Sequence, residues 1–162
     1  MTTQRSKGKT MFRLLSLLVL ITVATQAFAA EIPDRYWPRW RGPADSGSAA
    51  HGDCPVKWSS EDGFQWKTRL PGIGCSTPVV WDTHILLTST LDGRDLALAY
   101  DWNGDLLWKK EIGAGIPGKH RNGSGSNPSI VTDGERVFAY FKSGNLAGLD
   151  LDGSILWQTN LQ

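Results

Sequence analysis

The residues of this chain whose types and spacing could bind a ligand gather in one short stretch, where Lys119, His120, Arg121 and Asn122 follow one another. Cationic and amide side chains in a row supply positive charge and N–H donors, which is the chemistry that anions require. This stretch is the best candidate in the chain for a ligand-binding loop. The competing interpretation is a solvated loop whose Arg and His side chains form only local hydrogen bonds.

Other patterns imitate catalytic or cofactor motifs, but their context excludes them. Gly113, Gly115 and Gly118 match the spacing of a dinucleotide-binding motif, yet the following residues favour a loop instead of the helix that such a motif needs. The run from Asp150 to Gly153 imitates the start of a calcium loop, but it lacks the later glycine and glutamate. No serine lies in a nucleophile elbow, and the histidines are dispersed. We therefore predict no catalytic residues and no metal site.

The element that must position these residues is a repeat whose two copies begin fifty residues apart, at Ser76–Val80 and Ser126–Ile130. Each copy carries an Asp, a Gly three residues later and a Trp seven residues after the Asp. These residues are Asp101, Gly104 and Trp108 in the first copy, and Asp150, Gly153 and Trp157 in the second. A period of about 40–50 residues is typical of β-propeller blades.

Each copy divides into four short segments rich in β-branched and large apolar residues, which predicts a four-stranded antiparallel sheet. The predicted strands are 77–81, 84–89, 95–101 and 105–112 in the first copy, and 128–132, 136–141, 146–150 and 155–161 in the second. Asn103-Gly104 and Asp152-Gly153 favour the left-handed conformations of two-residue hairpins. The predicted fold class is all-β, a partial β-propeller of about two and a half blades, with a β-sandwich or an open meander as the alternative.

Three tryptophans each end a predicted strand, at 66, 108 and 157, where a ring can wedge between neighbouring sheets. The stretch from Ala99 to Trp108 resembles the tryptophan-docking motif that closes the blades of PQQ-like (pyrroloquinoline quinone-like) propeller repeats. The second copy keeps the Asp, Gly and Trp of this motif but has Gly148 where Ala is usual. The resemblance implies a docking role for Trp66, Trp108, Trp157, Gly104, Gly153, Asp101 and Asp150.

The stretch from Trp37 to Pro43, with two Trp, two Arg and two Pro, resembles the opening of secreted, planctomycete-type PQQ-like repeat proteins. Relatives of this kind include BamB-like scaffold proteins as well as quinoprotein dehydrogenases. The dehydrogenases hold PQQ and Ca²⁺ in a closed propeller, with an adjacent-cysteine disulfide and carboxylates from several blades. The resemblance therefore implies no cofactor in this chain by itself, and PQQ only in a complete propeller.

Residues 1–30 have the pattern of a secretory signal peptide. A basic start precedes an apolar run from Leu14 to Ala24, too short to span a bilayer, and Ala27-Phe28-Ala29 supplies a small-x-small cleavage site. We predict cleavage after Ala29 and no stable membrane span; the alternative is an uncleaved anchor. This segment holds four of the 17 basic residues and none of the 16 acidic ones, so the rest has a net charge near −3. That charge argues against nucleic acid as a partner.

Two cysteines, Cys54 and Cys75, lie in the part of the chain that such a signal would export, where an oxidising compartment lets disulfides persist. A disulfide between them would close a loop of about twenty residues, worth roughly 3 kcal/mol in the chain-entropy model. The sequence leaves two alternatives open, this disulfide and a pair of unrelated thiols.

These patterns predict a signal peptide at 1–30, an N-terminal extended segment at 31–63 and propeller blades over 64–162, with full blades at about 76–112 and 126–161. We expect an exported scaffold, periplasmic or extracellular, that binds or assembles proteins without catalysis. The alternative is the N-terminal part of a PQQ-dependent dehydrogenase. Because open sheet edges invite pairing, we expect either a fragment whose partners are the missing blades of its own parent chain, or several copies that assemble into a ring.

Overall fold

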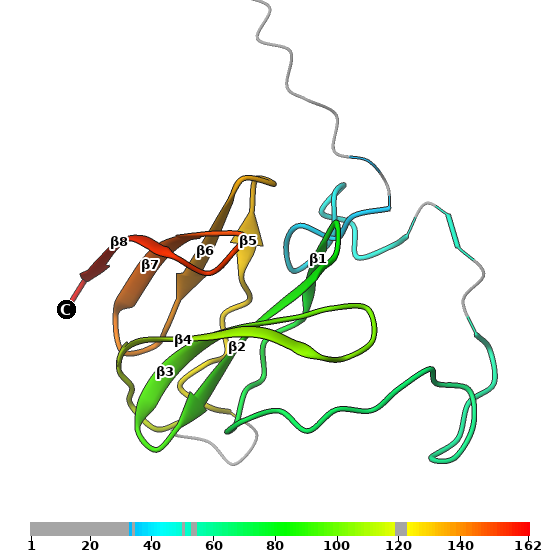
Figure 1. Cartoon of the computed structure of the whole chain (residues 1–162), viewed down its shortest axis with the longest axis horizontal. Helices are drawn as coiled ribbons and strands as arrows, with labels where there is room; N and C mark the ends of the chain where they lie inside the picture. The colour runs from blue at the N-terminus through cyan, green and yellow to red at the C-terminus, as the bar shows by residue number, and fades with distance from the viewer. Residues whose placement is uncertain (1–32, 34, 50, 53–54, 119–122) are drawn as a thin grey trace, which may run out of the picture. The chain divides into compact units, whose positions relative to one another are not determined.

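The structure is a computed structural model that describes residues 33, 35–49, 51–52, 55–118 and 123–162. Within these residues the regular elements are eight strands in two antiparallel sheets of four, each with its strands in chain order (Figure 1). Blade 1 contains β1 (Val79–Trp81), β2 (His84–Leu91), β3 (Arg94–Tyr100) and β4 (Leu106–Ala114). Blade 2 contains β5 (Val131–Thr132), β6 (Arg136–Tyr140), β7 (Asn145–Asp150) and β8 (Ile155–Asn160). The predicted all-β partial propeller is confirmed.

Within the two repeat copies the predicted strands are confirmed except at the start of each blade, where β1 and β5 begin later than expected. Pro78 and Pro128 lie just before these strands, and proline has no N–H to donate to a ladder. In blade 1 a side chain connects this stretch to the neighbouring strand, because Ser76 Oγ accepts the amide N–H of Thr88 at 3.1 Å. Each blade therefore starts with an irregular stretch that still follows its neighbouring strand.

The turns between the strands differ in kind. Between β2 and β3, Asp92 and Gly93 both have positive φ, of 50° and 72°, as a two-residue type I′ hairpin requires. Between β3 and β4 the predicted two-residue hairpin is wrong, because Asn103 does not share the positive φ of Gly104. The carboxylate of Asp101 instead accepts two amide N–H groups of a longer turn. This side-chain acceptor stabilises the longer turn at the end of the blade.

Both blades carry a bulge just before the tryptophan of their last strand. In blade 1, two successive residues of β3 pair with Trp108 and Leu106, which leaves Leu107 as the extra residue of β4. Blade 2 repeats the arrangement in β8, with Leu156 as the extra residue before Trp157. Because a bulge increases the local twist and re-aims the side chains beside it, the repeat fixes the direction of the tryptophan ring as well as its position.

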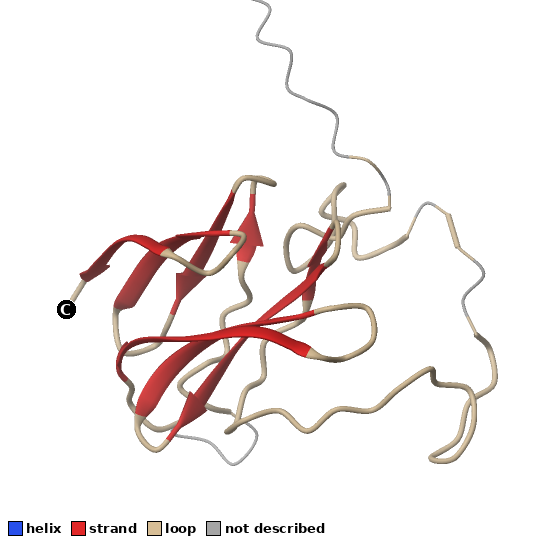
Figure 2. Cartoon of the chain, in the orientation of Figure 1, coloured by secondary structure: helices blue, strands red, loops and turns tan. Residues whose placement is uncertain are grey.

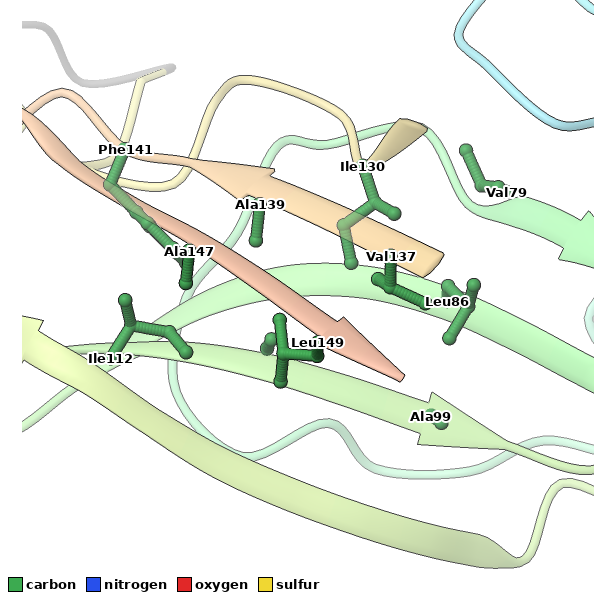
Figure 3. Close-up of a cluster of buried hydrophobic side chains, with 11 residues drawn as sticks. Val79, Leu86, Ala99, Ile112, Ile130, Val137, Ala139, Phe141, Ala147 and Leu149 are labelled. Carbon is green, nitrogen blue, oxygen red and sulfur yellow. The ribbon is translucent and has the colours of Figure 1, made fainter. Parts of the chain in front are cut away.

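The main core lies between the two blades, which turn small and branched side chains toward each other (Figure 3). Alternation along a strand sends Ala97 and Ala99 of β3 to this face, and Ala147 and Leu149 of β7 meet them. The buried members are Val79, Leu86, Ala97, Ala99, Ile112, Ile130, Val137, Ala139, Phe141, Ala147 and Leu149. Alanines on both sheets allow close approach, and removal of this apolar surface from water is the main term that holds the blades together.

The opposite face of blade 1 has a smaller cluster, formed by Leu87, Leu96, Leu98 and Tyr100. The segment before β1 runs along this blade: Ser89 Oγ donates to the carbonyl of Pro71, and Ile73 bridges to Thr90. The strand predicted to end at Trp66 is not formed, and residues 64–72 are irregular (Figure 2). A strand needs a neighbour for its backbone groups, and no described strand pairs with this segment.

One acidic side chain is fully buried between the blades. Asp95 of β3 accepts hydrogen bonds from Ser143 Oγ at 2.5 Å and from Asn145 Nδ2 at 2.9 Å, both in blade 2. Asn145 also donates to the carbonyl of Ala114 and accepts from Asn160 Nδ2. A buried carboxylate is unfavourable unless its oxygens are hydrogen-bonded. This network therefore favours a single register of one blade against the other.

Replacing Asn145 with Ala should lower the free energy of unfolding by about 1–3 kcal/mol, because buried Asp95 loses a donor and the Ala114 carbonyl loses its partner. Urea denaturation followed by tryptophan fluorescence measures the change. The control is Gln158→Ala, which truncates an exposed side chain of β8 and should change stability by less than about 0.5 kcal/mol. Equal losses in the two variants would contradict the role of the buried network.

Candidate functional site

The N-terminal segment joins the first strands of the two sheets. Trp37 exchanges two backbone hydrogen bonds of 2.8 Å with Val80 of β1, and the carbonyl of Pro38 accepts from the Thr132 amide of β5 at 3.0 Å. The side chain of Pro38 is fully buried. Because β1 and β5 are the edge strands of their sheets, these two residues cover both edges and tie them together.

Tight turns then fold the following residues back. The amide of Gly42 donates to the carbonyl of Arg39 at 2.9 Å, and the amide of Gly47 donates to the carbonyl of Arg41 at 2.9 Å. Gly42 has a φ of 77°, and a Cβ there would lie 2.8 Å from the Trp37 ring, so a side chain at this position would be strained and would clash. The backbone that carries the two arginines is therefore fixed by its own hydrogen bonds.

A hollow of about 410 Å³ lies beside these turns. Its walls come from the turned segment and from the stretches that lead into β1 and β5. The lining residues are Arg39, Trp40, Arg41, Asp45, Cys75, Thr77, Asn127, Pro128, Ser129 and Val131. Two guanidinium groups and one carboxylate make this lining net positive. We call this feature the inner-edge hollow.

The two arginines keep most of their hydrogen-bonding capacity. Arg39 Nε lies 3.5 Å from Asp45 Oδ1, and Arg39 Nη2 donates a long bond of 3.4 Å to the Pro43 carbonyl. Arg41 Nη2 donates to the carbonyl of Ser46 at 3.1 Å. A guanidinium carries five N–H groups, so these contacts within the described residues use a minority of them. The remaining N–H groups can be shared with an anion.

The stretches before β1 and β5 add neutral polar groups to the hollow. The amide of Thr77 donates to Ser129 Oγ at 2.9 Å, which ties the two stretches together. Asn127 Oδ1 accepts from the amide of Ser124 at 2.7 Å, an arrangement that holds the side-chain amide in place. Within the described part of the chain, no three His, Cys, Asp or Glu side chains gather as a metal ion would require. The chemistry of the inner-edge hollow is that of anion recognition.

A second recurring contact joins a tryptophan ring of one segment to a turn of the next blade. Trp108, at the end of blade 1, donates from Nε1 to the carbonyl of Leu151 in blade 2 at 2.8 Å. Its ring lies against Gly153, where a Cβ would come within 2.6 Å of the indole. Gly153 also has a φ of 81°, so this turn requires glycine both for its backbone and for the approach of the ring.

Trp66 makes the same contact with the corresponding turn of blade 1. Its Nε1 donates to the carbonyl of Trp102 at 2.7 Å, and its ring lies against Gly104. Trp157, in the equivalent place at the end of blade 2, is 42% exposed, and its ring lies over Gly148 of its own sheet. Two of the three predicted docking tryptophans thus contact an Asp-x-x-Gly turn, and the third is partly exposed and contacts no such turn within the described residues.

A family model described as outer membrane protein assembly factor BamB matches residues 49–162. The chain belongs to this family. The predicted PQQ-like repeat is therefore confirmed for the BamB-family chain. A comparison with curated proteins finds no match.

The other predicted site residues of this BamB-family chain lie in different places. Cys75 is exposed and lines the inner-edge hollow, while Cys54 lies outside the described residues. The predicted ligand-binding loop also lies outside them and consists of Lys119, His120, Arg121 and Asn122. The three glycines that imitate a dinucleotide motif begin inside β4 with Gly113, in agreement with their rejection as a helix-start motif.

The inner-edge hollow was not predicted as a site. Its signal in the sequence is the alternation of Arg39, Trp40 and Arg41, because guanidinium groups bind carboxylates and an indole beside them offers an apolar surface. A second missed signal is Asp95, an acidic residue at the start of the apolar stretch 95–101. Charged residues are seldom buried without partners, so its position indicates a polar network in the core.

The Asp101 carboxylate depends on its turn for its ionisation. The hydrogen bond from the Asp105 amide lowers the pKa of Asp101 below its ordinary value of 3.8, and the bonds from Asn103 add to this effect against a smaller opposing effect of burial. The ionised form is therefore favoured by folding. Because the same turn presents the carbonyl that Trp66 contacts, the charge of Asp101 supports the docking geometry.

Replacing Trp108 with Phe should lower the free energy of unfolding by about 1–2 kcal/mol, because the Leu151 carbonyl loses the indole N–H while most of the ring packing remains. The matched control is Trp157→Phe, since Trp157 is 42% exposed and its indole N–H donates to no group of the described residues, so this change should cost less than about 0.5 kcal/mol. Urea denaturation of both variants followed by circular dichroism measures the difference. A Trp157→Phe loss as large as that of Trp108→Phe would contradict the docking role.

The stability of the chain should fall at acid pH in part through Asp101. Since folding lowers the pKa of Asp101, its contribution is present above the ordinary value of 3.8 and is lost as the pH falls through the folded value. Asp101→Asn should therefore flatten the loss of stability below about pH 4. Urea midpoints at a series of pH values test this, with Asp105→Asn as the control of equal charge. Parallel pH profiles for the wild type and Asp101→Asn would count against it.

Proposed function

We propose that this chain is an exported, non-catalytic β-propeller segment that acts as a binding or assembly scaffold outside the cytoplasm. The observation that carries the proposal is the pair of contacts made by Trp66 and Trp108 in a chain whose family is described as an outer membrane protein assembly factor. Contacts of this kind hold the sheets in a fixed arrangement. A rigid frame lets loops and edges bind partners with little loss of conformational entropy.

The export part of the proposal is supported by the sequence of residues 1–30, which lies outside the described residues. A basic start, a short apolar run and the Ala27-Phe28-Ala29 site support removal of this segment after Ala29. The exported part would then begin at Ala30 and include the N-terminal segment 31–63 and the blades 64–162, in the periplasm or outside the cell. The described residues contain no helix able to cross a membrane.

The scaffold part of the proposal is supported by the surface of blade 2. Its last strand, β8, keeps Ile155, Leu156 and Trp157 exposed next to one another. Exposed apolar groups that lie together mark surfaces for protein partners. The partner is another protein or further blades of the parent chain. A ring of several copies is less favoured, because Trp66 already occupies the blade 1 turn on which the Trp157 of a neighbouring copy would have to dock.

The competing function, a PQQ-dependent oxidoreductase, finds little support in the residues present. The resemblance to quinoprotein dehydrogenases implies an adjacent-cysteine disulfide and several carboxylates around Ca²⁺. The inner-edge hollow instead has a single carboxylate, Asp45, which already pairs with Arg39. Cys54 and Cys75 are far from adjacent in the sequence. The donor set therefore does not fit PQQ with Ca²⁺.

One preparation tests the proposal. The full chain is expressed in a Gram-negative host and purified from the periplasm, where its N-terminus should be Ala30, and Ala29→Lys should accumulate uncleaved because the cleavage site needs a small residue. The purified protein should then reduce no dye with alcohols or sugars after addition of PQQ and Ca²⁺. A cytoplasmic chain that keeps residues 1–29 would contradict export, and turnover would contradict the scaffold.

A further inference from the structure

We infer that the inner-edge hollow binds a carboxylate-bearing peptide segment of a partner protein, with the carboxylate held by Arg39 and Arg41 and a neighbouring apolar side chain on Trp40. The inference rests on the proposed scaffold function, because it names the chemistry of what the scaffold holds. It adds a site that lies apart from the docking tryptophans and from the predicted loop at 119–122.

The charge of the two arginines favours an anion as the ligand of the inner-edge hollow. Arg39 and Arg41 project from one turned segment, and their side chains keep most of their N–H groups available after the contacts to Pro43 and Ser46. The ion pair of Arg39 with Asp45 is long, at 3.5 Å, and both side chains are exposed, so it is a weak competitor. A guanidinium is a planar fork that matches the two oxygens of a carboxylate. The pair can therefore receive one carboxylate at little cost.

An exposed aromatic ring, that of Trp40, lies beside the two arginines in the lining of the hollow. Trp40 is 65% exposed, and the Arg41 guanidinium lies 6.0 Å from its ring. Pro128 and Val131 extend the apolar surface on the side of blade 2. An exposed indole beside a cation offers an apolar side chain a surface to cover while its charged neighbour reaches the arginine. This combination selects a segment with apolar and acidic residues close together.

Net charge argues for a carboxylate and against a phosphate. Two arginines and Asp45 leave the lining with an excess of about one positive charge, which one carboxylate neutralises and a dianionic phosphate exceeds. The apolar wall would also remain uncovered by inorganic phosphate. The mildly acidic chain beyond residue 30 gives polyanions such as nucleic acid no wider basic surface.

The site is also preorganised. The two backbone bonds between Trp37 and Val80 and the bond from Thr132 to Pro38 anchor the start of the turned segment to both blades. Gly42 closes the next turn against the Trp37 ring. Since the backbone under the arginines is fixed before binding, a ligand need order only the side chains, which preserves affinity. Because this segment is hydrogen-bonded to both blades, a partner bound at the hollow would lie beside both blades.

The test is fluorescence anisotropy with the full chain and a labelled peptide of alternating glutamate and leucine. The matched probe is the same peptide with every glutamate replaced by glutamine. The glutamate peptide should bind at least about tenfold more tightly than its glutamine counterpart at low salt, and the difference should shrink as ionic strength rises. Arg41→Gln and Trp40→Ala should each weaken binding of the glutamate peptide by about tenfold.

Two control variants keep charge and folding effects apart. Arg94→Gln removes another exposed arginine that pairs with a carboxylate, Glu111, and Trp58→Ala removes another exposed tryptophan outside the hollow. Both should bind the glutamate peptide like the wild type. Equal binding of the two peptides, or equal losses in the control variants, would overturn the inference. If the chain is exported and inactive with PQQ but does not bind the glutamate peptide, the proposed peptide site is wrong and the proposed scaffold function stands.

Discussion

The hydrogen bond from the Trp108 indole to the Leu151 carbonyl, with the ring against Gly153, is the contact on which the arrangement of the two sheets depends. The bulge before Trp108 aims the ring, and the positive φ of Gly153 opens the turn that receives it. With the ring in place, the alanine-rich faces of β3 and β7 meet closely enough to exclude water. The buried carboxylate of Asp95 then reaches its donors in blade 2.

Much of the fold could be predicted because the sequence repeats itself at the scale of a blade. Strand periodicity and turn residues placed most of the strands within a few residues. The turn at Asn103 could not be predicted from its dipeptide, because the Asp101 carboxylate captures two amides and lengthens the turn. The strand ending at Trp66 does not form, because a β-strand needs a second segment to pair with. The local sequence pattern of one segment does not show whether such a partner is present.

The candidate site was harder to predict than the fold. The inner-edge hollow draws its walls from three stretches that are far apart in the sequence, and only pairing of Trp37 with β1 and of Pro38 with β5 brings them together. Residue types alone identified the stretch at 119–122, because its charges are consecutive. Arg39 and Arg41 are separated by Trp40, and they form a site only because the turn at Gly42 fixes the backbone that carries them. A site assembled by long-range pairing leaves only a weak mark in the local sequence.

The contact between ring and turn is not symmetric, since one side supplies an indole and the other a carbonyl and a glycine. An interface of this kind is heterologous, so two identical blade pairs cannot meet through it about a twofold axis. The blade pair consequently has a polarity. On the side of blade 1, Trp66 already fills the Gly104 turn, and on the side of blade 2, Trp157 offers a ring without a turn to receive it. By this contact, a further unit on the side of blade 2 would place its turn over Trp157.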